Sequence, residues 1–288
     1  MELRVLKYFL VAAREENITK AAALLHVTQP TLSRQLMQLE EELGGKLFRR
    51  GKYRVSLTED GMLLRRRAQE IVELAEKTEQ EFQRQEGELA GAISIGTGES
   101  NSMTALSRRM AGFRREHPLV RFHIYSATAD EIQERLEKGL LDLGILTEPA
   151  DIGRYEFIRL PKRDQWGVWV DREHPLAARE RVTPQDLLGV PLLLPQRERV
   201  QQELAGWFGD DFEKAEVAAT YNLILNAANM IRNGVGIALG FLLGNLSDDL
   251  RFIPLSPALE TGSVLVWKKD QAFSPTAAAF LRDLRRAE

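Results

Sequence analysis

Residue types that can read the edges of DNA bases gather between positions 28 and 38 of this 288-residue chain. Arginine can donate two hydrogen bonds to guanine, glutamine can pair with the edge of adenine, and a threonine methyl can contact the thymine methyl. A recognition helix reads bases mainly with its N-terminal residues. The pattern predicts DNA contact by one set of side chains: Thr28, Gln29, Pro30, Thr31, Ser33, Arg34 and Gln38.

A basic stretch follows this set. Between Gly44 and Leu57 there are five lysines and arginines and no acidic residue. The formal net charge of the chain is only −3, but residues 1–67 carry a net +5 and the remainder carries −8. A β-wing at this place would contact phosphates, which position a protein on DNA without reading sequence. We predict backbone contacts by Arg50, Lys52 and Arg54, although a solvated basic surface would give the same pattern.

The elements that must position these side chains are three short helices. Apolar residues from Leu6 to Ala13 recur at helical spacing and predict a first helix. Thr19 is the expected N-cap of a second helix over Lys20–Leu25, and Thr28 or Gln29 of a third that Gly44 ends. This is a helix-turn-helix layout. The alternative is an ordinary three-helix bundle that does not bind DNA.

The motifs of this region resemble the LysR-type transcriptional regulators. Thr19–Leu25, Val27–Gln35, Leu39–Gly44, Lys46–Arg50 and Leu57–Gly61 carry the resemblance, which extends over the whole chain. Gly45 and Arg49 depart from the family's usual residues, at the wing. The resemblance implies a winged helix-turn-helix, a long linker helix and a two-lobed α/β effector domain similar to periplasmic binding proteins. It also implies promoter DNA, a small-molecule effector, a homodimer that forms a tetramer, and RNA polymerase for an activator.

A long polar helix is predicted after the wing, over residues 59–87. Apolar and small residues recur there at spacings of 4, 3, 4, 3 and 4, as in a heptad seam. The seam residues are Leu64, Ala68, Ile71, Ala75, Thr78 and Phe82. We expect this face to pair with a second copy of the chain; the alternative is packing against the helix's own domain.

The last two hundred residues alternate short apolar runs with helical stretches, which predicts an α/β domain with a largely parallel sheet. Ligands bind such domains beyond the carboxyl ends of strands. The polar residues expected there are Gly98, Glu99, Ser100, Asn101, Ser102, Thr128, Thr147 and Gln196. Helix capping explains the serines equally well. Hydroxyls at a helix start suit an anion, whereas Glu99 would repel an anion and select an amine or polar group.

The residues that several other functions require are absent from the sequence or incomplete in it. The chain has no cysteine, which excludes disulfides and thiol nucleophiles, and its four histidines form no recognisable metal set. Gly96-Thr97-Gly98 is only part of a dinucleotide fingerprint. No apolar run is long enough to span a bilayer, and Met1–Arg4 begin a helical pattern without an apolar leader, so we expect a cytoplasmic protein.

Together these patterns predict a sequence-specific DNA-binding regulator controlled by an effector, not an enzyme, with no cofactor. We expect a DNA-binding domain over 1–58, the linker over 59–87 and an effector domain over 88–288. By the resemblance, one lobe of the effector domain covers about 92–162 and 265–288, and the other about 163–264. The alternative is a solute-binding or catalytic α/β protein with a helical dimerisation module.

Overall fold

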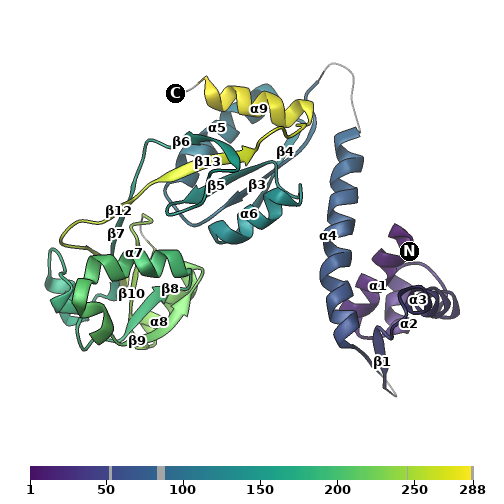
Figure 1. Cartoon of the computed structure of the whole chain (residues 1–288), viewed down its shortest axis with the longest axis horizontal. Helices are drawn as coiled ribbons and strands as arrows, with labels where there is room; N and C mark the ends of the chain where they lie inside the picture. The colour runs from purple at the N-terminus through teal and green to yellow at the C-terminus, as the bar shows by residue number, and fades with distance from the viewer. Residues whose placement is uncertain (52–53, 83–87, 245, 287–288) are drawn as a thin grey trace. The chain divides into compact units, whose positions relative to one another are not determined.

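The computed structural model describes residues 1–288 except 52–53, 83–87, 245 and 287–288, and it divides into two compact units, Met1–Gln83 and Arg84–Glu288 (Figure 1). Among the described residues, no helix combines the length and apolar character that crossing a membrane requires.

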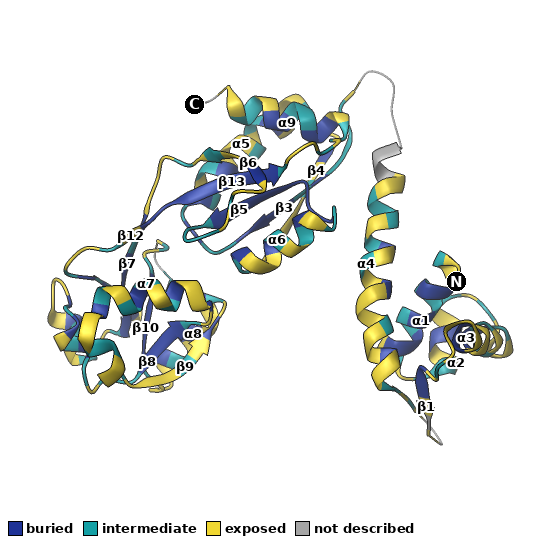
Figure 2. Cartoon of the chain, viewed as in Figure 1, coloured by how far each residue is buried: buried dark blue, intermediate teal, exposed yellow. Residues whose placement is uncertain are grey.

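The first unit is a helical bundle with a small two-stranded wing. Its elements are α1 (Leu3–Glu15), α2 (Ile18–Leu24), α3 (Gln29–Leu43), β1 (Phe48–Arg50), β2 (Val55–Leu57) and α4 (Glu59–Phe82). Phe9 of α1 is fully buried and its ring lies 5.3 Å from that of Phe48. Leu32, Leu36 and Leu39 turn the apolar face of α3 into the same core, which leaves the opposite face of that helix to solvent (Figure 2).

Local capping fixes where the helices begin. The N-cap of α2 is Asn17, whose side chain accepts the backbone N–H of Lys20, so the prediction of Thr19 as the cap was wrong by two residues. Thr28 caps α3 by accepting the N–H of Thr31, and Gly44 ends the helix in a left-handed conformation with φ of 73°. Such a φ favours glycine because it has no Cβ.

A buried carboxylate joins α3 to the wing. Glu40 is 5% exposed, and its Oε1 accepts the backbone N–H of Leu47 at 2.9 Å and of Phe48 at 3.2 Å. Lys46 Nζ donates to Oε2 at 2.8 Å. Burial raises the pKa of Glu40, but these hydrogen bonds outweigh burial and hold the pKa below its ordinary value. Glu40 therefore sets the start of the wing relative to α3.

Helix α4 packs closely on the same unit. Thr58 Oγ1 donates to the carbonyl of Lys46 at 2.5 Å, and a Cβ at Gly61 would lie 2.1 Å from the carbonyl oxygen of Leu47. Ala68 and Val72 are buried in the helical core, with Leu64 packed against it. The predicted seam therefore lies partly against the chain's own α1, since heptad spacing does not distinguish a partner within the chain from one outside it.

The second unit has two lobes, each built on one sheet. The first sheet has the strand order β4-β3-β5-β13-β6. Its strands are β3 (Gly91–Thr97), β4 (Val120–Ser126), β5 (Leu143–Thr147), β6 (Tyr155–Arg159) and β13 (Ser263–Lys268). Helices α5 (Ser102–Glu116), α6 (Ala129–Glu137) and α9 (Pro275–Arg285) pack on it.

The second lobe has the strand order β11-β7-β10-β8-β9, with β12 paired to β7. Its strands are β7 (Asp164–Asp171), β8 (Leu192–Pro195), β9 (Val217–Tyr221), β10 (Ile237–Phe241), β11 (Leu250–Pro254) and β12 (Glu260–Thr261). Its helices are α7 (Glu198–Phe208) and α8 (Ile224–Arg232), with short 3-10 turns at Pro175–Ala178, Gln185–Leu187 and Gly209–Lys214.

The sheets are mixed, so the prediction of a largely parallel sheet was wrong. β3 pairs in parallel with β4 and β5, but β13 is antiparallel to both of its neighbours, and β7 is antiparallel to β10, β11 and β12. The chain passes to the second lobe before β7 and returns after β12 (Figure 1). The start of β7 pairs with β12, so the two segments that connect the lobes lie side by side.

The Glu40 contacts generate a stability prediction. Replacing Glu40 with alanine leaves two buried N–H groups unpaired and should lower the free energy of unfolding by about 1–3 kcal/mol at neutral pH. Because the folded-state pKa is lowered, the carboxylate's contribution is present above pH 4.5 and is lost as the pH falls through the folded-state pKa. Urea unfolding from pH 7 to pH 3 measures both effects. Glu41→Ala, at an exposed neighbour, is the control; equal stability of the two variants at pH 7 would contradict the role of Glu40.

Candidate functional site

The polar face of α3 presents the residues predicted to read DNA. Thr28, Gln29, Pro30, Arg34 and Gln38 are exposed, whereas Thr31 and Ser33 are half-buried; these seven lie together along the first turns of the helix and its cap. Gln29 Nε2 donates to Ser33 Oγ at 2.8 Å, and the hydroxyls of Thr28 and Thr31 lie 2.8 Å apart. Arg34 makes no hydrogen bond or ion pair with the described residues, so its guanidinium is available.

A polar groove of about 270 Å³ connects this face to the wing. Gln29 and Ser33 line it from α3, and Arg54 lines it from the wing, so the structure brings together members of both predicted groups. Asn17 and Thr19, at the start of α2, line the groove as well. The sequence pattern predicts Thr19 only as a helix cap, and it predicts neither residue as a DNA contact. Lys52 and the side chain of Arg50 lie outside the described residues.

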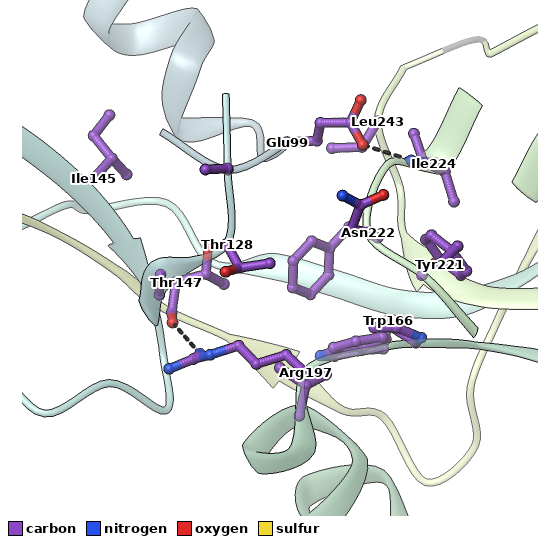
Figure 3. A pocket seen from close by; sticks show the side chains of 17 residues that line it. Glu99, Thr128, Ile145, Thr147, Trp166, Arg197, Tyr221, Asn222, Ile224 and Leu243 are labelled. Carbon is purple, nitrogen blue, oxygen red and sulfur yellow. Dashed lines mark hydrogen bonds between the residues drawn. The ribbon is translucent and has the colours of Figure 1, made fainter. Parts of the chain in front are cut away.

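A cavity of about 120 Å³ lies between the two lobes of the second unit (Figure 3). Four of the predicted effector residues line it: Gly98, Glu99, Thr128 and Thr147. They follow strands β3, β4 and β5, at the carboxyl ends where ligands bind α/β sheets. The opposite lobe contributes Trp166, Tyr221, Asn222 and Phe241, among others.

The other four predicted residues do not line the cavity. Ser100 and Ser102 are buried, and their hydroxyls have no hydrogen-bond partner in the described part of the chain. Gln196 is exposed, and its backbone N–H donates to the carbonyl of Tyr221. Asn101 instead bridges the lobes: its Nδ2 donates to Asp164 Oδ1 at 2.9 Å and to the carbonyl of Leu242 at 2.6 Å.

Asp164 anchors that bridge at the start of β7. Its side chain is 1% exposed, and burial raises its pKa against the lowering effect of the two hydrogen bonds from Asn101. Nearby, Trp166 Nε1 donates to Thr261 Oγ1 at 2.7 Å across the β7–β12 pair. The crossing point between the lobes is thus held by buried polar contacts.

Arg197 is the principal residue that the sequence analysis missed. It precedes α7, is 9% exposed, and donates through Nε and Nη2 to the two oxygens of Asp130, each at 3.0 Å. Its Nη1 donates to the carbonyl of Thr147 at 3.3 Å, as Figure 3 shows. Asp130 belongs to α6 of the other lobe, so this bidentate pair links the lobes beside the cavity. In the sequence, a buried and paired arginine before a helix looks the same as an arginine exposed to solvent.

A second link crosses the cavity itself. Glu99 Oε2 accepts the backbone N–H of Ile224, the first residue of α8, at 2.6 Å. Next to it, Tyr221 donates its hydroxyl to the carbonyl of Leu239 at 2.6 Å, and burial, with the Glu99 charge as a further cause, raises the pKa of Tyr221. The phenol therefore stays neutral.

Two family profiles match the chain. The bacterial regulatory helix-turn-helix protein, lysR family, matches residues 3–62, and the LysR substrate binding domain matches residues 86–288. The chain belongs to the LysR family. This LysR-family protein is therefore a DNA-binding transcriptional regulator with an effector-binding domain, as predicted, and the family decides against an enzyme.

Relatives and solved structures agree with this membership. This LysR-family chain is 31% identical to the hydrogen peroxide-inducible genes activator of Pectobacterium carotovorum subsp. carotovorum, over 83% of the chain and 79% of the relative. It is 27% identical to the Hca operon transcriptional activator HcaR of Escherichia coli (strain K12), over 94% and 93%. The crystal structure of CbnR, a LysR family transcriptional regulator, has the same fold, with a TM-score of 0.80 at 22% identity, covering 100% of this chain and 99% of CbnR.

The fold prediction is confirmed by these matches: an N-terminal helix-turn-helix unit followed by a two-lobed α/β domain. Full-length CbnR in complex with its target DNA matches as well, with a TM-score of 0.77 at 23% identity over 100% of both chains.

Proposed function

We propose that this LysR-family regulator reads its operator with α3 in the major groove. The observation that carries this assignment is the groove in which Gln29 and Ser33 of α3 meet Arg54 of the wing. Bases would be contacted by Gln29, Pro30, Thr31, Ser33 and Arg34, with Thr28 and Gln38 beside them, and phosphates by Arg50, Lys52 and Arg54. Asn17 and Thr19 join the phosphate contacts because they line the same groove.

In this proposal, three successive segments of the chain have different functions. Residues 1–58 read DNA, 59–87 link and dimerise, and 88–288 sense the effector in the cavity that Glu99, Thr147 and Trp166 line. An effector that binds one arrangement of the lobes better than another would shift the population of arrangements and so the geometry on DNA. This takes place in the cytoplasm, on double-stranded promoter DNA, with RNA polymerase as a partner if the protein activates.

The dimer would form through the exposed face of α4. Leu63, Ile71 and Leu74 are 61%, 40% and 43% exposed, and Thr78 is exposed on the same side of the helix. Of the predicted seam, Ile71 and Thr78 belong to this face, whereas Ala68 is covered by the chain itself. The side chain of Phe82 lies outside the described residues. A second copy of α4 would cover these apolar side chains, and pairs of such dimers would form the tetramer.

Arg34→Ala tests the DNA-reading face. Loss of a bidentate guanine contact costs about 1–3 kcal/mol of discrimination at each half-site, so specific retardation of the DNA upstream of the chain's own gene should weaken at least tenfold. Arg108→Ala removes an equal charge from an exposed position of α5 and should bind as the parent does. Both proteins are compared by gel-shift titration against that DNA and a shuffled duplex; full specific binding by Arg34→Ala would remove Arg34 from the reading face.

Ile71→Glu tests the dimer face. A carboxylate buried against the partner's helix is costly, so the variant should shift toward the monomer in sedimentation velocity at micromolar concentration. Gln69→Glu adds the same charge at an exposed position on the other side of α4 and should leave the assembly unchanged. Identical assembly of the Ile71→Glu variant and the parent would exclude this face as the dimer seam.

A further inference from the structure

The wall of the cavity between the two lobes, called the cleft below, is largely apolar. The lobes contribute Ile145, Trp166, Val200, Ile224, Phe241 and Leu243. The rings of Trp166 and Phe241 lie 4.5 Å apart in an edge-to-face arrangement. A ligand held here must place an apolar body against these side chains and offer its polar group to one of the few polar side chains present.

Among the described residues that line the cleft, Glu99 and Arg197 alone carry a full charge, and the guanidinium of Arg197 already has protein partners. Among the described residues, its guanidinium donates two hydrogen bonds to Asp130 and one to the carbonyl of Thr147. An anionic ligand that recruited Arg197 would have to break this bidentate pair. Among its described lining residues, the cleft therefore holds no uncommitted cation for a carboxylate or phosphate.

Glu99 also occupies the place where an anionic ligand would gain most. Helix N-termini attract anions through their free N–H groups, and the first N–H of α8 is already bonded to Glu99 Oε2. The other oxygen, Oε1, has no hydrogen-bond partner among the described residues, and the side chain is only half-buried. Figure 3 shows the carboxylate at the cavity beside Ile224 and Leu243. One acceptor with negative charge is thus left for a ligand.

The size of the cavity limits the apolar body. Its volume is about 120 Å³. A closed apolar cavity of about 150 Å³ binds benzene, so this cleft suits one ring or a short chain. An ammonium group beside Glu99 could also rest over the face of a neighbouring aromatic ring, which attracts cations.

We propose that the effector of this cleft is a small amine with one ring or a short alkyl chain. Its ammonium pairs with Glu99 Oε1, and its apolar body packs against Trp166 and Phe241. This inference rests on the proposed function of the cleft as the effector site. It concerns the charge and size of the ligand, not whether the N-terminal unit binds DNA.

Two series matched in carbon skeleton test the proposal on the full chain by calorimetry: benzylamine, benzyl alcohol and benzoate, and n-butylamine, n-butanol and butyrate. At least one amine should bind ten or more times as tightly as its matched acid and alcohol. Glu99→Gln keeps an oxygen for the N–H of Ile224 and should abolish that preference, with circular dichroism showing an unchanged fold. Glu198→Gln, an exposed carboxylate at the start of α7, should retain the preference.

Tighter binding of either acid, binding of neither amine, or amine binding unaffected by Glu99→Gln would overturn the proposal. A gel shift with the upstream DNA is run on the same preparations, with no amine, alcohol or acid added. Loss of specific retardation there counts against the proposed DNA-reading function, whereas retained retardation with no preference for amines counts against the amine effector alone.

Discussion

The carboxylate of Glu40 is the interaction on which the DNA-reading surface depends. Its carbon chain belongs to the recognition helix, but its oxygens hold the backbone of Leu47 and Phe48 at the start of the wing. The base-reading face and the phosphate-contacting loop can act as one surface only if their spacing is fixed. A buried charge with several donors fixes spacing more strictly than apolar packing, because leaving any of those donors unpaired is costly. Gly61 serves the same end by allowing α4 to approach Leu47.

In the effector unit, by contrast, the contacts between the two lobes can be altered by a ligand. Each lobe has its own apolar cores. Among the described residues, three side chains make hydrogen bonds between the lobes beyond the crossing strands: Asn101 with Asp164 and Leu242, Arg197 with Asp130 and Thr147, and Glu99 with the first N–H of α8. Two of these three border the cavity, so a ligand competes directly with the contacts that hold the lobes together. A small molecule can then alter the arrangement of the lobes through differences in contact free energy alone.

The sequence was most informative where local chemistry decides structure. Thr28 and Gly44 mark the bounds of α3, as their capping chemistry predicts. It was least informative where long-range pairing decides. The antiparallel insertion of β13 and the link from Arg197 to Asp130 join residues far apart in the chain. The predicted seam of α4 included Ala68, which is buried in the chain's own core, because a helical stripe does not identify its partner. Asn101 was assigned to a ligand, yet it bridges the lobes.

Sequence-specific DNA binding by the full chain is the central claim, and a competition titration by fluorescence anisotropy tests it most directly. Labelled DNA from upstream of the chain's own gene is displaced by the same duplex or by a shuffled duplex of equal length and composition, at about 0.15 M salt. Specific binding should be at least about 10³-fold tighter than binding to the shuffled duplex. Equal displacement by both duplexes would contradict the account.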